Sequence, residues 1–367
     1  MAGDLNLSVA EARAAIAAAL RPISETETVL LTHALGRVLA ADLLSPIDVP
    51  AHDNSAMDGY AFDGALLRAD AASLFTSMGT VYAGAPFDGA VPAGCCVRIM
   101  TGAVMPAGCD TVVPQELCSA DGDRVRIEPD VIRRGENRRP RGEDLGAGRP
   151  ALLAGRVLKP ADLGLVASLG IGELKMMRRL RVALFSTGDE LRGPGQALEP
   201  GCIYDSNRYS LLGALQRLGM EVIDLGLVRD DPAALQATLQ VAVAQADGGR
   251  ASWLFALPGN PVAALVTFYA FAREALLQLA GAAPAPLPVL QARSANAIRK
   301  RPGRTEFQRG FVSPAPGGGF QVAVNASQGA GILRSMVEAN ALVVLGHEQE
   351  SVAVGDLVDV WLFDGLV

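Results

Sequence analysis

The sequence predicts an α/β multidomain protein, with a central parallel α/β sheet domain, a β-rich inserted domain, a helical and extended N-terminal domain and a C-terminal β domain. Three observations carry this prediction. At 367 residues the chain exceeds one ordinary core, because domains hold roughly 150 residues each. Glycine, proline and short strands dominate the second quarter of the chain, and from Arg181 strands alternate with helices.

The composition excludes several functional classes. Lys and Arg total 32 against 39 Asp and Glu, a net charge of −7 that argues against a nucleic-acid binder with a basic face. Five cysteines without CxxC spacing, with three histidines, give neither a zinc site nor a disulfide framework, and predict a reduced, cytosolic protein. The N-terminus lacks a signal-peptide pattern and no 18 apolar residues run together, so we expect a soluble, cytoplasmic chain without a membrane span.

The N-terminal elements follow from caps and turns. Ser8 to Leu20 predicts an amphipathic helix, with Ser8 as N-cap and Glu11 completing a capping box. Short strands such as "CCVRIM" and "RVRIEP", with turns about every ten residues, predict a small β-rich barrel or sandwich. "KPADLGLVASLGIGELKMM" returns to helix. The predicted domains are 1–47 plus 148–178, 48–147, 179–282 and 283–367.

The third predicted domain, 179–282, is expected to consist of strand–loop–helix units. "RVALFSTGDEL", "EVIDLGLV" and "WLFAL" predict strands. "SNRYSLLGALQRLG", "DPAALQATLQVAVAQA" and the long "PGNPVAALVTFYAFAREALLQLAG" predict helices. After an "APAPLP" linker, strands such as "FQRGFV" and "DLVDVWLF" predict a separate β domain.

Polar residues follow each of the three predicted strands of the sheet domain. They lie in "STGDEL" (Ser186–Leu191), "VRDDP" (Val228–Pro232) and "LPGNP" (Leu257–Pro261). Ligands bind at the carboxyl ends of such strands, and a helix N-terminus favours an anion. Carboxylates beside that helix start suit a phosphate ligand bridged by Mg²⁺.

Each of these features also has an ordinary structural explanation. Asp231 before Pro232 fits a helix cap, and Glu190 and Asp230 fit solvated loop charges. "PGNP" and "TGAVMPAGCD" fit turns, and "RRGENRRPRGED" fits a solvated charge run. Cys95 and Cys96 are best placed in the core.

The segment "DVPAHDNSAMDGYAFDG" (Asp48–Gly64) crowds four aspartates into a loop with few cationic neighbours in sequence. Together with the other motifs it points to one family. "RIMTGAVMPAGCDTVVPQE", "RPRGEDLGAG", "RVALFSTGDEL", "GCIYDSNRYSLLGAL", "LPGNPVAALVTFY", "GRTEFQRG" and "ASQGAGILRSMVEANALVVL" follow in order. This set resembles the molybdopterin molybdotransferase (MoeA) family, related to the C-terminal E domain of gephyrin, over nearly the whole chain.

The resemblance implies an elongated homodimer with a molybdopterin-binding sheet domain. It implies Mg²⁺-dependent insertion of molybdate into adenylylated molybdopterin with AMP release, the last step of molybdenum cofactor assembly. A molybdopterin adenylyltransferase and molybdoenzymes or their chaperones are the implied partners. The acidic loop would face the sheet domain of the partner subunit, where substrate and metal supply positive charge.

The resemblance also names site residues. Its motifs place catalytic residues at Asp58, Asp144, Glu190 and Asp230, with Glu190 and Asp230 as metal ligands. Asp58 and Asp144 would orient ligand or water at the molybdate end, and Arg139 and Arg141 would contact the oxyanion. Further substrate-binding residues are Thr101, Ser186, Thr187, Gly188, Pro258, Gly259, Asn260 and Pro261. Pro140 interrupts an arginine run found in some relatives.

One departure from the family pattern follows Asp247. The family continues with a glycine-rich loop, SGGVSxGxxD, a helix, a strand and a "KPGKP" segment, whereas this chain reads "GGRASWLFALPGNP". Roughly forty residues that supply a phosphate cradle, a carboxylate and two lysines are absent. Either the written sequence omits them, which the intact flanking motifs favour, or the protein lacks them and little transfer is expected. The alternative functions are a non-catalytic molybdopterin-binding scaffold and a nucleotide-binding regulator.

Overall fold

The computed structural model describes residues 7–247, 252–285 and 287–366. The chain forms two compact units. One comprises Met1–Ala41, Ala154–Leu163 and Glu173–Val367, and the other comprises Asp42–Leu153 and Gly164–Gly172. We call the second the β-rich unit. Gly248–Ala251, which follow the point where the family pattern is interrupted, lie outside the described residues.

The β-rich unit is built on a six-stranded sheet in the order β7-β4-β6-β5-β9-β8. Successive residues of a strand point to opposite faces, and here both faces are covered. Ala61 and Val97 pack in one apolar cluster, whereas their neighbours Phe62 and Cys96 pack in another. Cys96 is fully buried, as predicted. The sheet strands are β4 (Gly59–Phe62), β5 (Ser73–Val81), β6 (Cys95–Ile99), β7 (Thr111–Pro114), β8 (Ser119–Asp121) and β9 (Arg124–Ile127).

Two short antiparallel ladders join the rest of the β-rich unit. β2 (Leu43–Leu44) pairs with β11 (Pro150–Leu152), and β3 (Asn54–Ser55) pairs with β10 (Arg138–Arg139). The second ladder brings the "NSAM" segment beside the arginine-rich motif. Short 3₁₀ turns form η2 (Gly64–Leu66) and η3 (Gln115–Leu117).

The N-terminal elements belong to the larger unit. Helix α1 (Val9–Ala19) begins at Ser8, whose side chain and that of Glu11 form the predicted capping box. Arg13 fixes this helix, because its Nε donates to Ala270 O at 2.7 Å and its guanidinium lies over the Trp361 ring. "KPADLGLVASLGIGELKMM" is only partly helical. The remaining elements are β1 (Thr26–Leu30), η1 (Leu31–His33) and β12 (Glu173–Met177), and β1 pairs with β12. Helix α2 (Pro160–Ser168) begins in the larger unit and ends in the β-rich unit.

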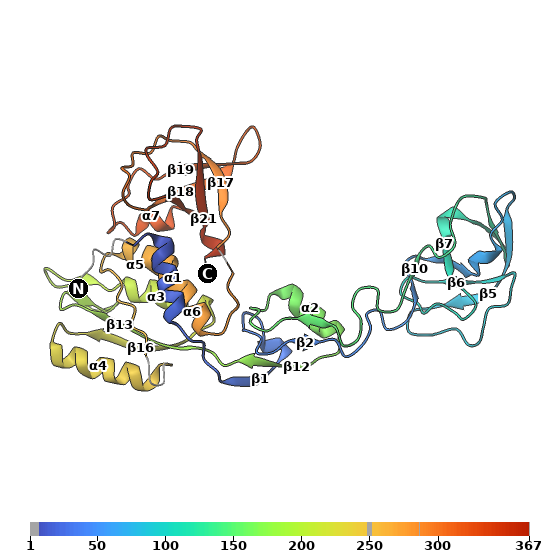
Figure 1. The fold of residues 1–367 in the computed structure, drawn as a ribbon, viewed down its shortest axis with the longest axis horizontal. Coiled ribbons are helices and arrows are strands. Elements are labelled where there is room, and N and C mark those ends of the chain that lie inside the picture. Colours follow the sequence, from blue (N-terminus) through green and yellow to red (C-terminus); the bar gives the residue numbers. More distant parts are fainter. Residues whose placement is uncertain (1–6, 248–251, 286, 367) are drawn as a thin grey trace. The chain divides into compact units, whose positions relative to one another are not determined.

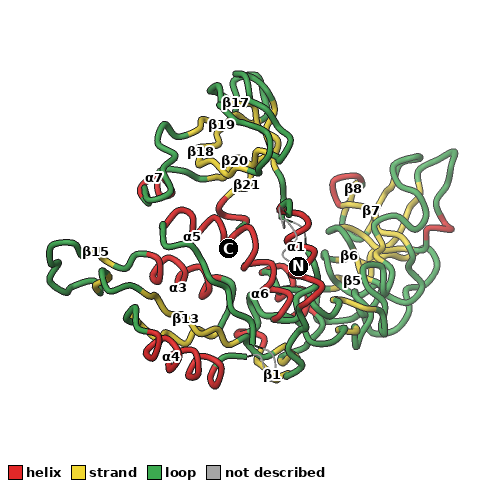
Figure 2. The backbone as a smooth tube through the Cα atoms, turned by 60° about the vertical axis from the view of Figure 1, so that its left-hand side comes forward, coloured by secondary structure: helices red, strands yellow, loops and turns green. Residues whose placement is uncertain are grey.

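The α/β part holds a parallel pair of strands, β13 (Arg181–Thr187) and β16 (Glu221–Val228). Helices α3 (Asn207–Arg217) and α4 (Pro232–Gln245) lie on opposite faces of this pair (Figures 1 and 2). Asp231 caps α4, since its Oδ2 accepts from Ala234 N at 2.8 Å. A second, short parallel pair is β14 (Leu191–Arg192) with β15 (Ile203–Tyr204).

The prediction of a strand at "WLFAL" is wrong, because residues 252–258 have no regular structure. A strand needs a hydrogen-bonded neighbour, and within the described residues β13 pairs with β16 alone. The predicted long helix is continuous but contains a π-helical turn. It consists of α5 (Pro261–Thr267), η4 (Phe268–Ala272) and α6 (Arg273–Leu279).

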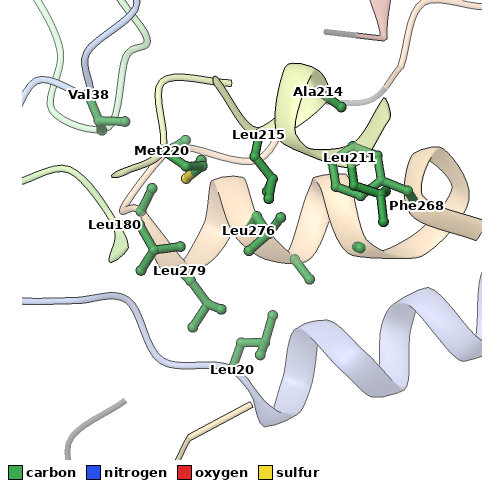
Figure 3. Packing of buried hydrophobic residues seen from close by; sticks show 14 residues of the cluster. Leu20, Val38, Leu180, Leu211, Ala214, Leu215, Met220, Phe268, Leu276 and Leu279 are labelled. Carbon is green, nitrogen blue, oxygen red and sulfur yellow. The ribbon is translucent and has the colours of Figure 1, made fainter. Parts of the chain in front are cut away.

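Helix α6 and η4 form the centre of the main apolar cluster of the larger unit. Figure 3 shows Leu276 and Leu279 of α6 packed with Leu180, Leu215 and Leu20. Among the described residues, the stretch Pro261–Leu279 is long and apolar enough to cross a membrane by length and composition alone. Core helices pass the same test, so this is weak evidence for a span.

The C-terminal strands close into a barrel in the order β17-β19-β18-β20-β21. Their alternating inward residues form a second core, which includes Val322, Val343 and Val360. The elements are β17 (Leu290–Ser294), β18 (Glu306–Pro314), β19 (Phe320–Val324), α7 (Arg334–Val337), β20 (Ala341–Leu345), β21 (Leu357–Leu362) and η5 (Phe363–Gly365).

Asp247 fastens the end of α4 to the start of β13. Its carboxylate accepts from Arg181 N at 2.6 Å and from Arg178 Nη2 at 2.8 Å, and its own N–H donates to Arg181 O at 3.0 Å. Burial alone would raise the pKa of Asp247, but the hydrogen bonds from Arg178 and Arg181 outweigh it, and the pKa is lowered. The Asp247 carboxylate is therefore charged in the folded protein at neutral pH.

We expect Asp247→Asn to lower the free energy of unfolding by about 2 kcal/mol at pH 7, since hydrogen bonds to a buried charge are lost. Because the folded-state pKa is depressed, this stabilisation is present above the unfolded value near 3.8 and is lost as the pH falls through the folded value. The difference between wild type and variant should therefore shrink in acid. Urea unfolding at several pH values measures it.

The matched control is Glu25→Gln. Glu25 lies 3.7 Å from the same Arg178 but its side chain is 62% exposed. This exposed pair should contribute less than about 1 kcal/mol. Equal destabilisation by both variants would contradict an anchoring role for Asp247.

Candidate functional site

The carboxyl ends of β13 and β16 lie side by side. Thr187 pairs with Val228, and Gly188 N donates to Val228 O at 3.2 Å. The loops that follow are also joined, because Asp230 N donates to Asp189 Oδ1 at 3.3 Å. The predicted metal ligands Glu190 and Asp230 are thus placed in neighbouring loops at one edge of the sheet.

Glu190 owes its position to the glycine two residues earlier. A Cβ added to Gly188 would lie 2.5 Å from Glu190 Oε2, and Gly188 has φ +151°. The backbone of this loop is also fixed at Glu190, since Ile203 N donates to Glu190 O at 2.9 Å. The absence of a side chain at Gly188 therefore lets the Glu190 carboxylate lie over the end of β13.

The donors at this edge match a Mg²⁺ ion that the substrate also ligates. Asp189, Glu190 and Asp230 are exposed, and none forms an ion pair in the described part of the chain. Among the residues that the structure describes, no group of three or more His, Cys, Asp or Glu side chains could form a complete metal site. Mg²⁺ commonly takes one or two carboxylates and completes its shell with waters and phosphate oxygens. Two carboxylates in adjacent loops fit that pattern.

The "LPGNP" segment begins α5 but offers fewer amides than the sequence predicts. Pro261 has no N–H, and Val262 N already donates to Ala330 O at 3.0 Å. Pro258, Gly259 and Asn260 are exposed. The segment is instead held by α3, because Asn207 Nδ2 donates to Gly259 O at 2.6 Å.

Two residues of this site were not singled out from the sequence. Asp205 is 3% exposed, accepts from Ser186 Oγ at 3.2 Å and pairs with Arg208 at 3.0 Å. Asn207 Oδ1 is buried without a hydrogen-bond partner. Both lie in "YDSNR" at the start of a predicted helix, where Asp and Asn usually indicate only a cap. Within the described residues, the Asn207 Oδ1 is an unsatisfied acceptor enclosed by protein atoms rather than an open ligand contact.

In the β-rich unit, Asp58 and Thr101 form a close pair. Thr101 donates to Asp58 Oδ1 from both its Oγ1 and its backbone N, each at 2.7 Å. The side-chain and backbone hydrogen bonds from Thr101 lower the pKa of Asp58. The two segments are joined by backbone bonds, since Gly102 N donates to Ser55 O at 2.8 Å. Asp58 is therefore held as an exposed anion.

The arginines predicted to contact an oxyanion are already engaged. Arg141 pairs with Asp48, and Arg139 pairs with Glu143 at 3.0 Å. Arg138, which the prediction omitted, pairs with Asp53 at 3.0 Å.

The expectation that the acidic loop lacks cationic partners is consequently wrong for Asp48 and Asp53. Their partners come from a segment about ninety residues later, a pairing that sequence spacing alone does not reveal. Asp144 donates its N–H to Val49 O at 3.0 Å, and its side chain is exposed.

The predicted residues fall into the two units separately. Asp58, Thr101, Arg139, Arg141 and Asp144 belong to the β-rich unit, and Ser186, Thr187, Gly188, Glu190, Asp230, Pro258, Gly259, Asn260 and Pro261 belong to the larger unit. The structure brings members of each set together. Convergence of the two sets on one ligand stays a prediction.

Three family models match the chain in order. They are described as the MoeA N-terminal region (domain I and II) at residues 7–170, a probable molybdopterin binding domain at 183–248 and the MoeA C-terminal region (domain IV) at 291–363. A molybdopterin molybdenumtransferase of Haemophilus influenzae is 35% identical over 405 residues, covering 98% of this chain and all of the relative. The chain belongs to the MoeA family.

Other relatives agree with this membership. A molybdopterin molybdenumtransferase of Nostoc is 33% identical over 371 residues, covering 88% of this chain and 85% of the relative. The crystal structure of a molybdopterin biosynthesis MoeA protein from Pyrococcus horikoshii is similar with a TM-score of 0.86 and 27% identity, covering 97% of this chain and 100% of that one. The multidomain α/β architecture predicted for the MoeA chain is confirmed.

The comparison also bears on the interruption after Asp247. The alignment with the Haemophilus relative extends over 405 positions, whereas this chain has 367 residues. Positions of the relative must therefore lack a counterpart here. The molybdopterin-binding match ends at residue 248, which is where the sequence pattern is interrupted.

We expect Thr101→Val to raise the pKa of Asp58 toward its ordinary value near 3.8, because one of the two donors to the carboxylate is lost. The backbone donor remains, so the return should be partial. Carbon-detected NMR titration of the Asp58 carboxyl measures it. Thr76→Val, on an exposed position of β5 in the same unit, is the control and should leave the titration unchanged.

Proposed function

We propose that this chain is a molybdopterin molybdotransferase that inserts molybdate into adenylylated molybdopterin with release of AMP. The observation that carries the proposal is the pair of carboxylates Glu190 and Asp230, which form no ion pair within the described residues and lie in adjacent loops at the carboxyl edge of a parallel strand pair. MoeA family membership and the names of the relatives support the same reaction class.

The residues at the carboxyl ends of β13 and β16 would have separate roles. Glu190 and Asp230 would hold Mg²⁺ against the substrate pyrophosphate, where it neutralises charge and polarises the phosphorus centre. Thr187 and the backbone amide of Gly259 would offer hydrogen bonds to phosphate oxygens, and Ser186 would do so after releasing Asp205, to which its Oγ now donates.

The β-rich unit would contribute at the molybdate end. Asp58 keeps its negative charge because Thr101 stabilises it, so it suits orienting a water or a ligand hydroxyl rather than binding an oxyanion directly. Arg139 and Arg141 would bind molybdate only by exchanging their present carboxylate partners. We further propose that the chain acts as a cytoplasmic homodimer, with an adenylyltransferase as the source of its substrate.

A second function is favoured by one observation. β13 pairs with a single strand in the described residues, and the sequence lacks the family's glycine-rich loop there. A non-catalytic molybdopterin-binding homologue would tolerate that loss, because it needs affinity without turnover. Such a protein would bind adenylylated molybdopterin without releasing AMP.

We expect Glu190→Gln and Asp230→Asn each to reduce Mg²⁺-dependent AMP release by about 100-fold or more, because the Mg²⁺ that would stabilise the reacting phosphate loses a charged ligand. Purified protein is incubated with adenylylated molybdopterin, molybdate and Mg²⁺, and AMP is quantified by chromatography. Both residues are exposed, so melting temperatures should stay unchanged.

Asp231→Asn is the matched control from the same loop. Its carboxylate caps α4, and asparagine caps equally well, so AMP release should be unaffected. Wild-type activity in Glu190→Gln or Asp230→Asn would remove that residue from the metal role. Binding by the wild type without any AMP release would favour the non-catalytic homologue.

The length of the natural protein is a first test that distinguishes the transferase from the non-catalytic homologue. An active transferase should be longer than 367 residues by about forty, since the phosphate cradle of the family lies in that segment. Intact mass spectrometry of the protein isolated from its source measures this. A mass equal to that of the written chain would predict little or no transfer.

A further inference from the structure

The β-rich unit contains an open pocket that the motifs described above do not use. Its volume is about 430 Å³, and its lining comes from the segment after β4 and from the loop that follows β9. Three arginines, Arg68, Arg133 and Arg134, share this lining with the apolar side chains Leu67 and Ile132. A concentration of cationic groups in a chain of net charge −7 calls for an anionic ligand.

One wall of the pocket is rigidly built. Arg134 Nε donates to Asp110 Oδ2 at 2.6 Å, and Asp110 Oδ1 accepts from Gly64 N at 2.8 Å. A Cβ at Gly64 would lie 2.2 Å from Thr111 Oγ1 and 2.8 Å from Arg134 Cγ. Only glycine permits this close approach, so the backbone at Gly64 and the stem of Arg134 are fixed against each other.

The other two arginines keep their charge available. In the described part of the chain, no carboxylate lies within ion-pair distance of the Arg133 guanidinium, although its backbone N–H is fixed by Glu136 Oε2 at 3.0 Å. Arg68 lies 3.8 Å from Asp70, and the two side chains are 62% and 84% exposed. A pair that exposed contributes little, so Arg68 can turn to a ligand at small cost.

The shape and chemistry of the pocket define a class of ligand. A volume of this size suits a small organic molecule rather than a bare ion. Guanidinium groups bind phosphate oxygens in a bidentate manner, whereas Leu67 and the largely buried Ile132 offer an apolar surface to a ring. Asp130, also in the lining, can accept from a ligand hydroxyl or amino group.

We propose that this pocket binds a small organic phosphate monoester of mononucleotide size, with the phosphate on Arg68 and Arg133 and the organic part on Leu67 and Ile132. The site lies entirely within the β-rich unit and shares no residue with the proposed catalytic edge. It therefore stands independently of the proposed function.

The test is calorimetric titration of the full chain with AMP, adenosine and inorganic phosphate, without Mg²⁺. AMP should bind at least about tenfold more tightly than either adenosine or inorganic phosphate, because only AMP engages both halves of the pocket. Inorganic phosphate binding as tightly as AMP would overturn the organic part of the proposal. Adenosine binding as tightly as AMP would overturn the role of the arginines.

Single substitutions in the lining test whether AMP binds in this pocket. Arg133→Gln and Arg68→Gln should each weaken AMP binding by about tenfold. Arg124→Gln, an exposed arginine of β9 outside the lining, removes the same charge from the same unit and should change the affinity less than about twofold. The substituted side chains are exposed, so unchanged melting temperatures are expected and verify the fold.

AMP is also the product of the proposed reaction, and AMP bound at the catalytic edge would be insensitive to Arg133→Gln and Arg68→Gln, because these side chains belong to the other unit. Binding in the pocket should survive Glu190→Gln and be weakened by Arg133→Gln. The proposal is overturned if Arg133→Gln and Arg68→Gln bind AMP like Arg124→Gln, or if AMP does not bind. Neither result would bear on AMP release at the other site.

Discussion

The parallel pairing of β13 with β16 is the constraint on which the candidate site depends. Parallel strands deliver their carboxyl ends to one edge, so the two loops that carry Glu190 and Asp230 become neighbours without any contact between their side chains. Asp247 secures the opposite end of β13 through its bonds to Arg178 and Arg181. The position of the carboxylates is thus set by backbone pairing and by one buried charge cluster behind it.

The aspartates of the acidic loop in the β-rich unit are stabilised in two different ways. Asp48 and Asp53 are matched by arginines from a distant segment, and these pairs hold the acidic loop against the "RRPRGED" motif. Asp58 and Asp63 differ, because their carboxylates accept from neutral donors: Asp58 from the amide and hydroxyl of Thr101, and Asp63 from the amide of Ala65. A carboxylate stabilised by neutral donors retains its negative potential, whereas an ion pair cancels it. This difference separates Asp58 from Asp48 and Asp53, whereas Asp63 serves as the cap of η2.

Local signals in the sequence predicted local structure well. The capping box at Ser8 and the cap at Asp231 depend on neighbours within a few residues, and the apolar runs that predict β13 and β16 are local signals too; all of these elements are present. Features set by distant partners were not predictable. The pairing of Asp48 with Arg141 spans 93 residues, and the buried Asn207 Oδ1 depends on packing against Gly259. For the same reason, composition alone did not reveal that arginines of "RRGENRRPRGED" pair with Asp48, Asp53 and Asp110.

The failed strand at "WLFAL" has a different physical origin. A parallel strand is normally buried on both faces, yet every residue of β13 up to Ser186 is only half-buried, and α4 contributes no buried residue. Trp253 and Leu254 are 43% and 69% exposed beside the interruption. Apolar residues that leave this much surface in water have lost the partner their sequence was suited to. We infer that the half-buried sheet and the exposed residues after the interruption have one origin, namely that the sheet lacks a strand that the family pattern places after Asp247. That strand would also give 252–257 the hydrogen-bonded neighbour that its β-type sequence requires.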